Sequence, residues 1–178
     1  GHDKMYAWLV ANDVPLANET HAFGGDQTAD YYAQVFDITP VRAAPNDPGD
    51  ACPETLNSIC VASNYVDDAS DRKLVPPSFQ GLDNPTSDRE EPDVIAFGGY
   101  TLDGNQGTEV ADLTGATDWT EIDGNSYATP VITSLLAHLH RRCDNLEQLG
   151  SRALIRTAAF SDNFFDWRYS TPVRLTDF

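Results

Sequence analysis

Short apolar runs along the chain have the length and composition of buried β-strands. They are rich in Ala, Val and Ile, and Pro, Gly, Asn or Asp, which favour turns, stand next to them. The runs cover residues 14–17, 41–44, 59–62 and 93–97. Polar segments at 67–71 and 76–92 predict a turn and an irregular surface segment.

Other segments carry apolar residues at the spacing of an amphipathic helix. This pattern predicts helices over residues 5–10, 27–36, 126–142 and 147–159. Short strands that alternate with helices are typical of a parallel sheet with both faces covered. The predicted fold class is therefore α/β, a parallel β-sheet sandwiched between helices.

The length of the chain indicates how many domains it forms, and its charge argues against some classes of partner. A chain of 178 residues with 40% hydrophobic content can bury one core, so we expect a single domain over 1–178. The formal charge of −17 repels phosphate backbones and anionic lipid, which argues against nucleic-acid and membrane partners. Such a self-repelling surface, almost without Lys, favours a secreted or extracytoplasmic protein.

The cysteines leave the redox state open. Cys52 and Cys60 flank a short loop that a disulfide could close, which would leave Cys143 unpaired. Two reduced cysteines in a loop are the alternative, and the sequence does not decide between them.

The strongest chemical motif is the heptapeptide at residues 124–130, Gly-Asn-Ser-Tyr-Ala-Thr-Pro, which runs into an apolar helix. By itself, a Ser before a helix is most often an N-cap. The whole motif, however, resembles the Gly-Thr-Ser-x-Ala-(Thr/Ser)-Pro motif of subtilisin-like serine proteases, with Asn125 replacing Thr. The resemblance implies that Ser126 is the nucleophile and that Gly124 lets substrate approach closely.

A second segment, Ala44-Pro45-Asn46, follows the run at 41–44 and resembles the Ala-Gly-Asn of the same family. The resemblance makes Asn46 the side-chain donor of an oxyanion hole and places Ala44 beside the substrate. Pro45 stands where the family has Gly, which changes the loop. By itself, Asn46 would be an ordinary turn residue.

Further matches set the register with the C-terminal part of the family's catalytic domain. Residues 58–63 resemble the strand after the oxyanion Asn, and residues 92–98 resemble the Pro-Asp-(Val)-x-Ala-Pro-Gly segment. Ala22, Phe23 and Gly24 fall where the family pairs with extended substrate. A plain loop is the competing interpretation of those three residues.

The base and carboxylate of a catalytic triad are not found in the sequence. The family's His-Gly-Thr motif is absent, and His138 and His140 lie roughly 18 to 21 Å along the helix that begins at Ser126. Neither His2 nor His21 stands in a supporting motif. Three explanations remain: a fragment whose precursor supplies the missing groups, an inactive relative kept for binding, or a rewired triad.

Two other function classes compete with the protease interpretation. The Gly-x-Ser-x-Ala pattern also resembles the nucleophile elbow of α/β-hydrolases, but that fold needs an acid and a His well downstream of the Ser. A catalytically inactive peptide- or protein-binding module is the main alternative. An endopeptidase would take a peptide or protein substrate and an N-terminal fragment of its precursor as partner. The family implies Ca²⁺, although no run here has a metal-loop spacing and no metal ligand is assigned.

Overall fold

The computed structural model describes the chain in several stretches. These are residues 2–20, 27–46, 52, 55–67, 73–75, 92–100, 108–111, 119–122, 124–143 and 145–158. Their helices are α1 (His2–Ala11), α2 (Gln27–Phe36), α3 (Asn125–His140) and α4 (Gln148–Ala158). Their strands are β1 (Leu16–Glu19), β2 (Thr39–Ala43), β3 (Ile59–Asp67), β4 (Lys73–Val75), β5 (Val94–Tyr100), β6 (Thr108–Ala111) and β7 (Trp119–Ile122). No described helix has both the length and the apolar character that crossing a membrane requires.

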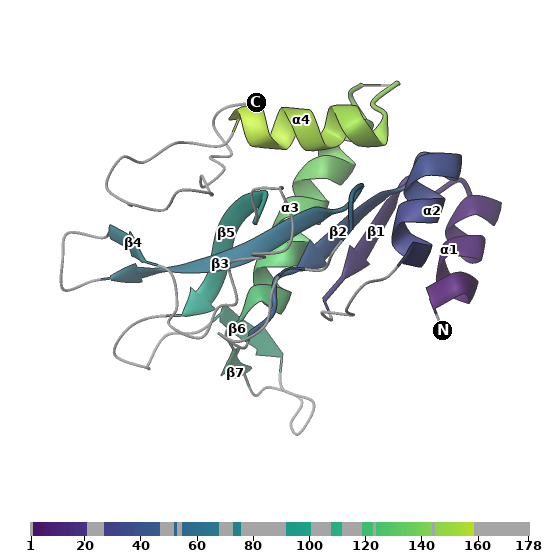
Figure 1. Cartoon of the computed structure of the whole chain (residues 1–178). Helices are drawn as coiled ribbons and strands as arrows, with labels where there is room; N and C mark the ends of the chain where they lie inside the picture. The colour runs from purple at the N-terminus through teal and green to yellow at the C-terminus, as the bar shows by residue number, and fades with distance from the viewer. Residues whose placement is uncertain are drawn as a thin grey trace.

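A parallel sheet forms the centre of the fold (Figure 1). Strand β3 pairs in parallel with β2 on one side and β5 on the other, and β1 pairs in parallel with β2. The short β4 runs antiparallel to the far end of β3, and β6 and β7 form a separate antiparallel pair. In a parallel arrangement the carboxyl ends of β1, β2, β3 and β5 meet at one edge, where ligands bind in open α/β sheets.

Helices cover the two faces of this sheet. Alternate residues of β2, β3 and β5 pack against the apolar face of α3, which crosses the sheet. The members of this core are Val41, Ile59, Val61, Val94, Ala96, Ala128, Ile132, Leu135, Leu136, Leu139 and Ile155. On the other face, α1 and α2 pack over β1 and β2, with Tyr6, Leu9, Ala17, Ala29 and Ile38 buried between them. The parallel β-sheet between helices is therefore confirmed.

A buried ion pair joins the first two strands beneath α1. The side chains of Glu19 and Arg42 lie 2.9 Å apart, and both are almost completely buried. Tyr6 of α1 donates its hydroxyl hydrogen bond to Glu19. Burial, together with the Glu19 carboxylate, raises the pKa of Tyr6 far above its usual range. These side chains lie on the α1 face of the sheet, away from α3.

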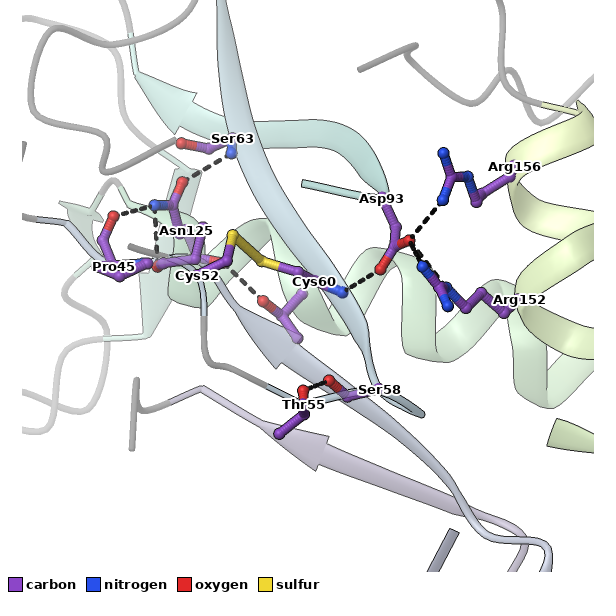
Figure 2. The surroundings of a disulfide bond; sticks show 12 residues. Pro45, Cys52, Thr55, Ser58, Cys60, Ser63, Asp93, Asn125, Arg152 and Arg156 are labelled. Atoms are coloured by element: carbon purple, nitrogen blue, oxygen red, sulfur yellow. Dashed lines mark hydrogen bonds and ion pairs between the residues drawn. A yellow bond between two sulfur atoms is a disulfide. The ribbon is translucent and has the colours of Figure 1, made fainter. Parts of the chain in front are cut away.

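Asp93 anchors α4 to the start of β5. Its buried carboxylate accepts a hydrogen bond from the backbone N–H of Cys60, at 2.9 Å, and pairs with Arg152 of α4 at 2.8 Å (Figure 2). Arg156, one turn further along α4, lies 3.4 Å from the same carboxylate. Asp93 therefore links β3, β5 and α4, whereas in the sequence it only helped to align the chain with the motifs of the family.

Several boundaries differ from those predicted. β1 begins at Leu16 and ends at Glu19, two residues later than the predicted run. β3 continues through Asp67, where a polar turn was expected, because its end pairs with β4. β5 likewise extends through Gly98 to Tyr100. Pairing with strands from elsewhere in the chain decides where each of these strands ends, so the composition of the strand itself does not predict its last residue. Most of the predicted irregular segment at 76–92 lies outside the described residues.

Candidate active site

Ser126 lies in the first turn of α3, at the edge where β1 and β2 end. Its hydroxyl donates a hydrogen bond to the backbone carbonyl of Thr20, at 2.7 Å, and Thr20 directly follows β1. This is the bond that the structure gives the hydroxyl within the described residues. A carbonyl oxygen holds the hydroxyl in place but is too weak a base to activate it.

The backbone before Ser126 takes a conformation that favours glycine. Gly124 has φ 128° and ψ 168°, a region that L side chains rarely adopt. Its N–H donates to the carbonyl of Gly98 in β5, at 3.2 Å. A Cβ on Gly98 would meet the Cβ of Ser63 at 2.2 Å, so β5 and β3 approach each other closely here. Two glycines thus allow β3, β5 and the start of α3 to converge.

Asn46 lies against this same stretch. Its Oδ1 accepts a hydrogen bond from the backbone N–H of Asn125, at 3.0 Å. Because a backbone N–H can only donate, this bond fixes which end of the amide is the oxygen, and the Nδ2 protons are directed elsewhere. A Cβ on Gly124 would lie 3.2 Å from that Nδ2. In the part of the chain that the structure describes, nothing accepts from Nδ2.

The start of α3 and the Asn46 amide together offer hydrogen-bond donors to an anion. The N–H of Ser126, in the first helical turn, has no acceptor within the helix, and the helix dipole adds positive potential there. Asn46 Nδ2 borders the same turn. Two neighbouring donors beside a hydroxyl can stabilise negative charge that develops on a carbonyl oxygen.

Asn125 is the residue at this site that sequence reasoning missed. It is completely buried, and its Nδ2 donates to the carbonyls of Ala44 and Pro45, at 3.0 and 2.7 Å. Its Oδ1 accepts the backbone N–H of Ser63, at 2.7 Å (Figure 2). The departure from the family's Thr was visible at this position, but a local sequence pattern does not tell what a buried amide will contact.

The other residues predicted to contact substrate are Ala44, Ala22, Phe23 and Gly24. Ala44 is buried, its N–H donates to Val61 at 2.8 Å and its carbonyl accepts from Asn125, so its contact with substrate stays a prediction. Ala22, Phe23 and Gly24 lie outside the described residues, as does His21. Their assignment to the substrate edge likewise stays a prediction.

The described histidines lie away from Ser126. His138 is exposed, and His140, at the far end of α3, meets Ser151 of α4 through its Nε2, at 3.0 Å. Burial lowers the pKa of His140, and the nearby Asp37 opposes that shift. His2 approaches Glu19 on the opposite face of the sheet, at 3.8 Å. Neither a His nor a carboxylate contacts the Ser126 hydroxyl among the described residues.

Metal ligands do not gather in the described stretches. No group of three or more His, Cys, Asp or Glu side chains there could hold an ion. The Asp-rich segments at 68–71 and 83–91 fall outside them. The described residues thus offer no fit to the Ca²⁺ that the family resemblance implies.

The structure resolves the redox question left by the sequence. Cys52 and Cys60 form a disulfide with a Cα–Cα separation of 6.5 Å, and Cys143 is a free, exposed thiol. The disulfide is buried with Ala44, Ala62 and Ile95 on the face of the sheet opposite α3. It therefore ties the chain that follows Asn46 to the middle strand of the sheet (Figure 2).

Solved structures of other proteins share the fold of this chain. A cold-adapted subtilisin-like serine proteinase is similar over 96% of this chain and 58% of its own, with 20% identity and a TM-score of 0.69. Fervidolysin from Fervidobacterium pennivorans, a keratinolytic enzyme related to subtilisin, is similar over 98% of this chain and 28% of its own, with 19% identity and a TM-score of 0.72. The prenylagaramide maturation protease PagA is similar over 98% of this chain and 64% of its own, with 16% identity and a TM-score of 0.68. The chain thus spans less than two thirds of each of these proteins.

Among curated proteins no match was found. The sequence profile described as the Subtilase family matches residues 15–173, which is most of the chain and includes both candidate segments. This chain belongs to the subtilase family.

Proposed function

We propose that this chain is the serine-bearing part of a subtilisin-like endopeptidase that hydrolyses peptide bonds. Ser126 is the nucleophile in this proposal, and Asn46 Nδ2 with the Ser126 N–H forms the oxyanion hole. The observation that carries it is the bond between Asn46 Oδ1 and the Asn125 N–H, which holds the amide next to the nucleophile's helix turn. Gly124 has no side chain, which leaves room for the Asn46 amide: a Cβ there would lie 3.2 Å from Asn46 Nδ2.

The proposed reaction follows from these positions. The Ser126 oxygen attacks the peptide carbonyl carbon while a base takes its proton, and the negative charge moves onto the carbonyl oxygen between the two N–H donors. The intermediate collapses when the C–N bond breaks and the amine leaves with that proton. Water then hydrolyses the acyl-enzyme by the same two steps.

The base and its carboxylate come, in this proposal, from an N-terminal fragment of the same precursor. Two observations support this partner. The chain spans only 58% and 64% of two similar proteases. β1, whose end holds the Ser126 partner Thr20, pairs with β2 on one side and with no other described strand. An edge strand presents unpaired backbone N–H and C=O groups, which suits the addition of another strand.

Substrate class and location are part of the same proposal. PagA is a prenylagaramide maturation protease and PatA a patellamide maturation protease, which supports a peptide or protein substrate here. The negative charge and the disulfide support a secreted or extracytoplasmic single domain.

A binding module is the second candidate. The observation that favours it is that the Ser126 hydroxyl rests on the Thr20 carbonyl, which cannot act as a base. A fluorophosphonate probe separates the two functions, since it reacts only with an activated Ser. The probe is applied to this chain and to the full precursor, and the labelled residue is identified by mass spectrometry.

We expect labelling of the precursor at residue 126. Ser126→Ala abolishes it, whereas Ser134→Ala, an exposed serine on the same helix, leaves it unchanged. If neither the chain nor the precursor is labelled, the endopeptidase proposal fails and the binding module takes its place.

A further inference from the structure

Two positions in this chain depart from the pattern of the family at the same site. Pro45 stands in place of Gly in the loop before Asn46, and Asn125 stands in place of Thr before Ser126. The structure brings these two departures into direct contact. Asn125 Nδ2 donates a hydrogen bond to the Pro45 carbonyl, at 2.7 Å, as Figure 2 shows.

Asn125 touches three successive residues of this loop. Its Nδ2 binds the carbonyls of Ala44 and Pro45, and its backbone N–H binds Oδ1 of Asn46. On its other side, Oδ1 of Asn125 accepts the Ser63 N–H from β3. One buried residue therefore fixes the loop from both its backbone and its side chain.

A Thr at position 125 would not make this set of bonds. Its hydroxyl carries one proton, whereas the Asn amide donates two and accepts at its oxygen. The amide also reaches further from the backbone than a hydroxyl on Cβ. With Thr, at least one of the buried loop carbonyls would lose its donor, which is unfavourable.

Pro45 makes the loop stiffer and removes one N–H from it. Proline fixes φ near −65°, so the carbonyls of Ala44 and Pro45 have fewer orientations available than in a loop with Gly. A fixed pair of carbonyls is a suitable partner for one rigid amide group. The two departures therefore complement each other.

We infer that Asn125 is a positioning residue that, paired with Pro45, sets the direction of the Asn46 amide relative to Ser126. The catalytic meaning of this inference rests on the proposed function. The physical pairing does not, because Asn125 precedes Ser126 by one residue and binds Asn46 directly. The distance between the nucleophile and its oxyanion donor is thus set through a single residue.

The first test is a double-mutant cycle on the whole chain with Asn125→Thr, Pro45→Gly and the double variant. Urea unfolding reports the equilibrium constant. We expect Asn125→Thr to raise the unfolding constant by about 10- to 100-fold. In the Pro45→Gly background the same change should raise the unfolding constant by a factor about ten times smaller, because a flexible loop depends less on the amide.

Asn12→Thr is the matched control, since Asn12 also donates its side-chain amide to a carbonyl, that of Trp8, but lies at the exposed end of α1. Its effect should add to that of Pro45→Gly without coupling. If the effects of Asn125→Thr and Pro45→Gly are additive as well, the pairing is wrong.

The second test reads the Asn46 side chain itself by NMR. Asn125→Asp keeps an acceptor for the Ser63 N–H and loses the donors to the loop carbonyls. We expect the Asn46 NH₂ signals to shift in this variant and in Asn125→Thr, while Ser63 N–H exchange stays slow in Asn125→Asp. Unchanged Asn46 signals in both variants overturn the positioning role.

Neither readout requires activity. If the coupling is present but neither this chain nor the full precursor is labelled by a fluorophosphonate, the proposed function fails and this inference stands. If the precursor is labelled but neither coupling nor shifted Asn46 signals are found, the proposed function stands and this inference fails.

Discussion

Gly124 leaves the space that the Asn46 amide needs: a Cβ on Gly124 would lie 3.2 Å from Asn46 Nδ2. The glycine also has φ 128°, so any side chain there is strained even before it meets a neighbour. The loop after β2 and the start of α3 can therefore pack together only because the residue at position 124 has no Cβ.

Gly124→Ala should lower the free energy of unfolding by about 1–3 kcal/mol, because it adds backbone strain and a tight contact with Asn46. Urea unfolding measures this loss. Gly150→Ala is the matched control, since Gly150 lies in α4 and its Cβ would meet only Leu146 Cδ1, at 3.4 Å. That variant should gain about 0.5–1 kcal/mol. Equal effects of the two variants would contradict the role given to Gly124.

Asn46→Ala should slow fluorophosphonate labelling of the active precursor by about 10²- to 10³-fold, because one oxyanion donor is lost. Stopped-time labelling at several probe concentrations gives the rate. Asn145→Ala, an exposed Asn before α4, should leave the rate unchanged. A rate within threefold of the native one in Asn46→Ala would remove Asn46 from the oxyanion hole.

Removal of the disulfide should loosen the chain that follows Asn46. Cys52→Ser combined with Cys60→Ser should lower the free energy of unfolding by about 2–3 kcal/mol, as expected for a short closed loop. Dithiothreitol should destabilise the native chain and have no effect on the double variant. Cys143→Ser changes only an exposed thiol and should stay within about 0.5 kcal/mol of the native chain. If dithiothreitol affects the native chain and the double variant alike, the loss does not come from the disulfide.

His140 should make the fold less stable in mild acid. Burial lowers the pKa of His140 in the folded state, so the unfolded chain, with a His pKa of about 6.5, takes up the proton first as pH falls. The stability that neutral His140 contributes is therefore complete at pH values above the pKa of the unfolded chain. It is lost as the pH falls from that pKa to the lowered pKa of the folded state. Urea unfolding from pH 7.5 down to pH 5 measures it.

His140→Gln should show a weaker loss over that range, since Gln does not titrate and can still bond to Ser151. His138→Gln, on an exposed position of the same helix, should keep the native pH dependence. The same slope in all three proteins would mean that His140 does not contribute.

Local patterns predicted the elements that depend on near neighbours. The helix at Gln27–Phe36 has the predicted ends, since apolar periodicity over a few turns marks a helix without reference to the rest of the chain. The motif around Ser126 likewise predicted the helix that follows it. The strands β4, β6 and β7 were not predicted, because their pairing partners determine them more than their own composition.

The sequence by itself determined the α/β class, the family, and the residue types that the chemistry needs, because periodicity and motifs are properties of contiguous residues. Tertiary structure decided which distant groups meet: the hydroxyl of Ser126 with the carbonyl of Thr20, and the amide of Asn125 with the loop before Asn46. Burial decides these contacts, because a polar group removed from water must find a partner, and the partner can come from any part of the chain.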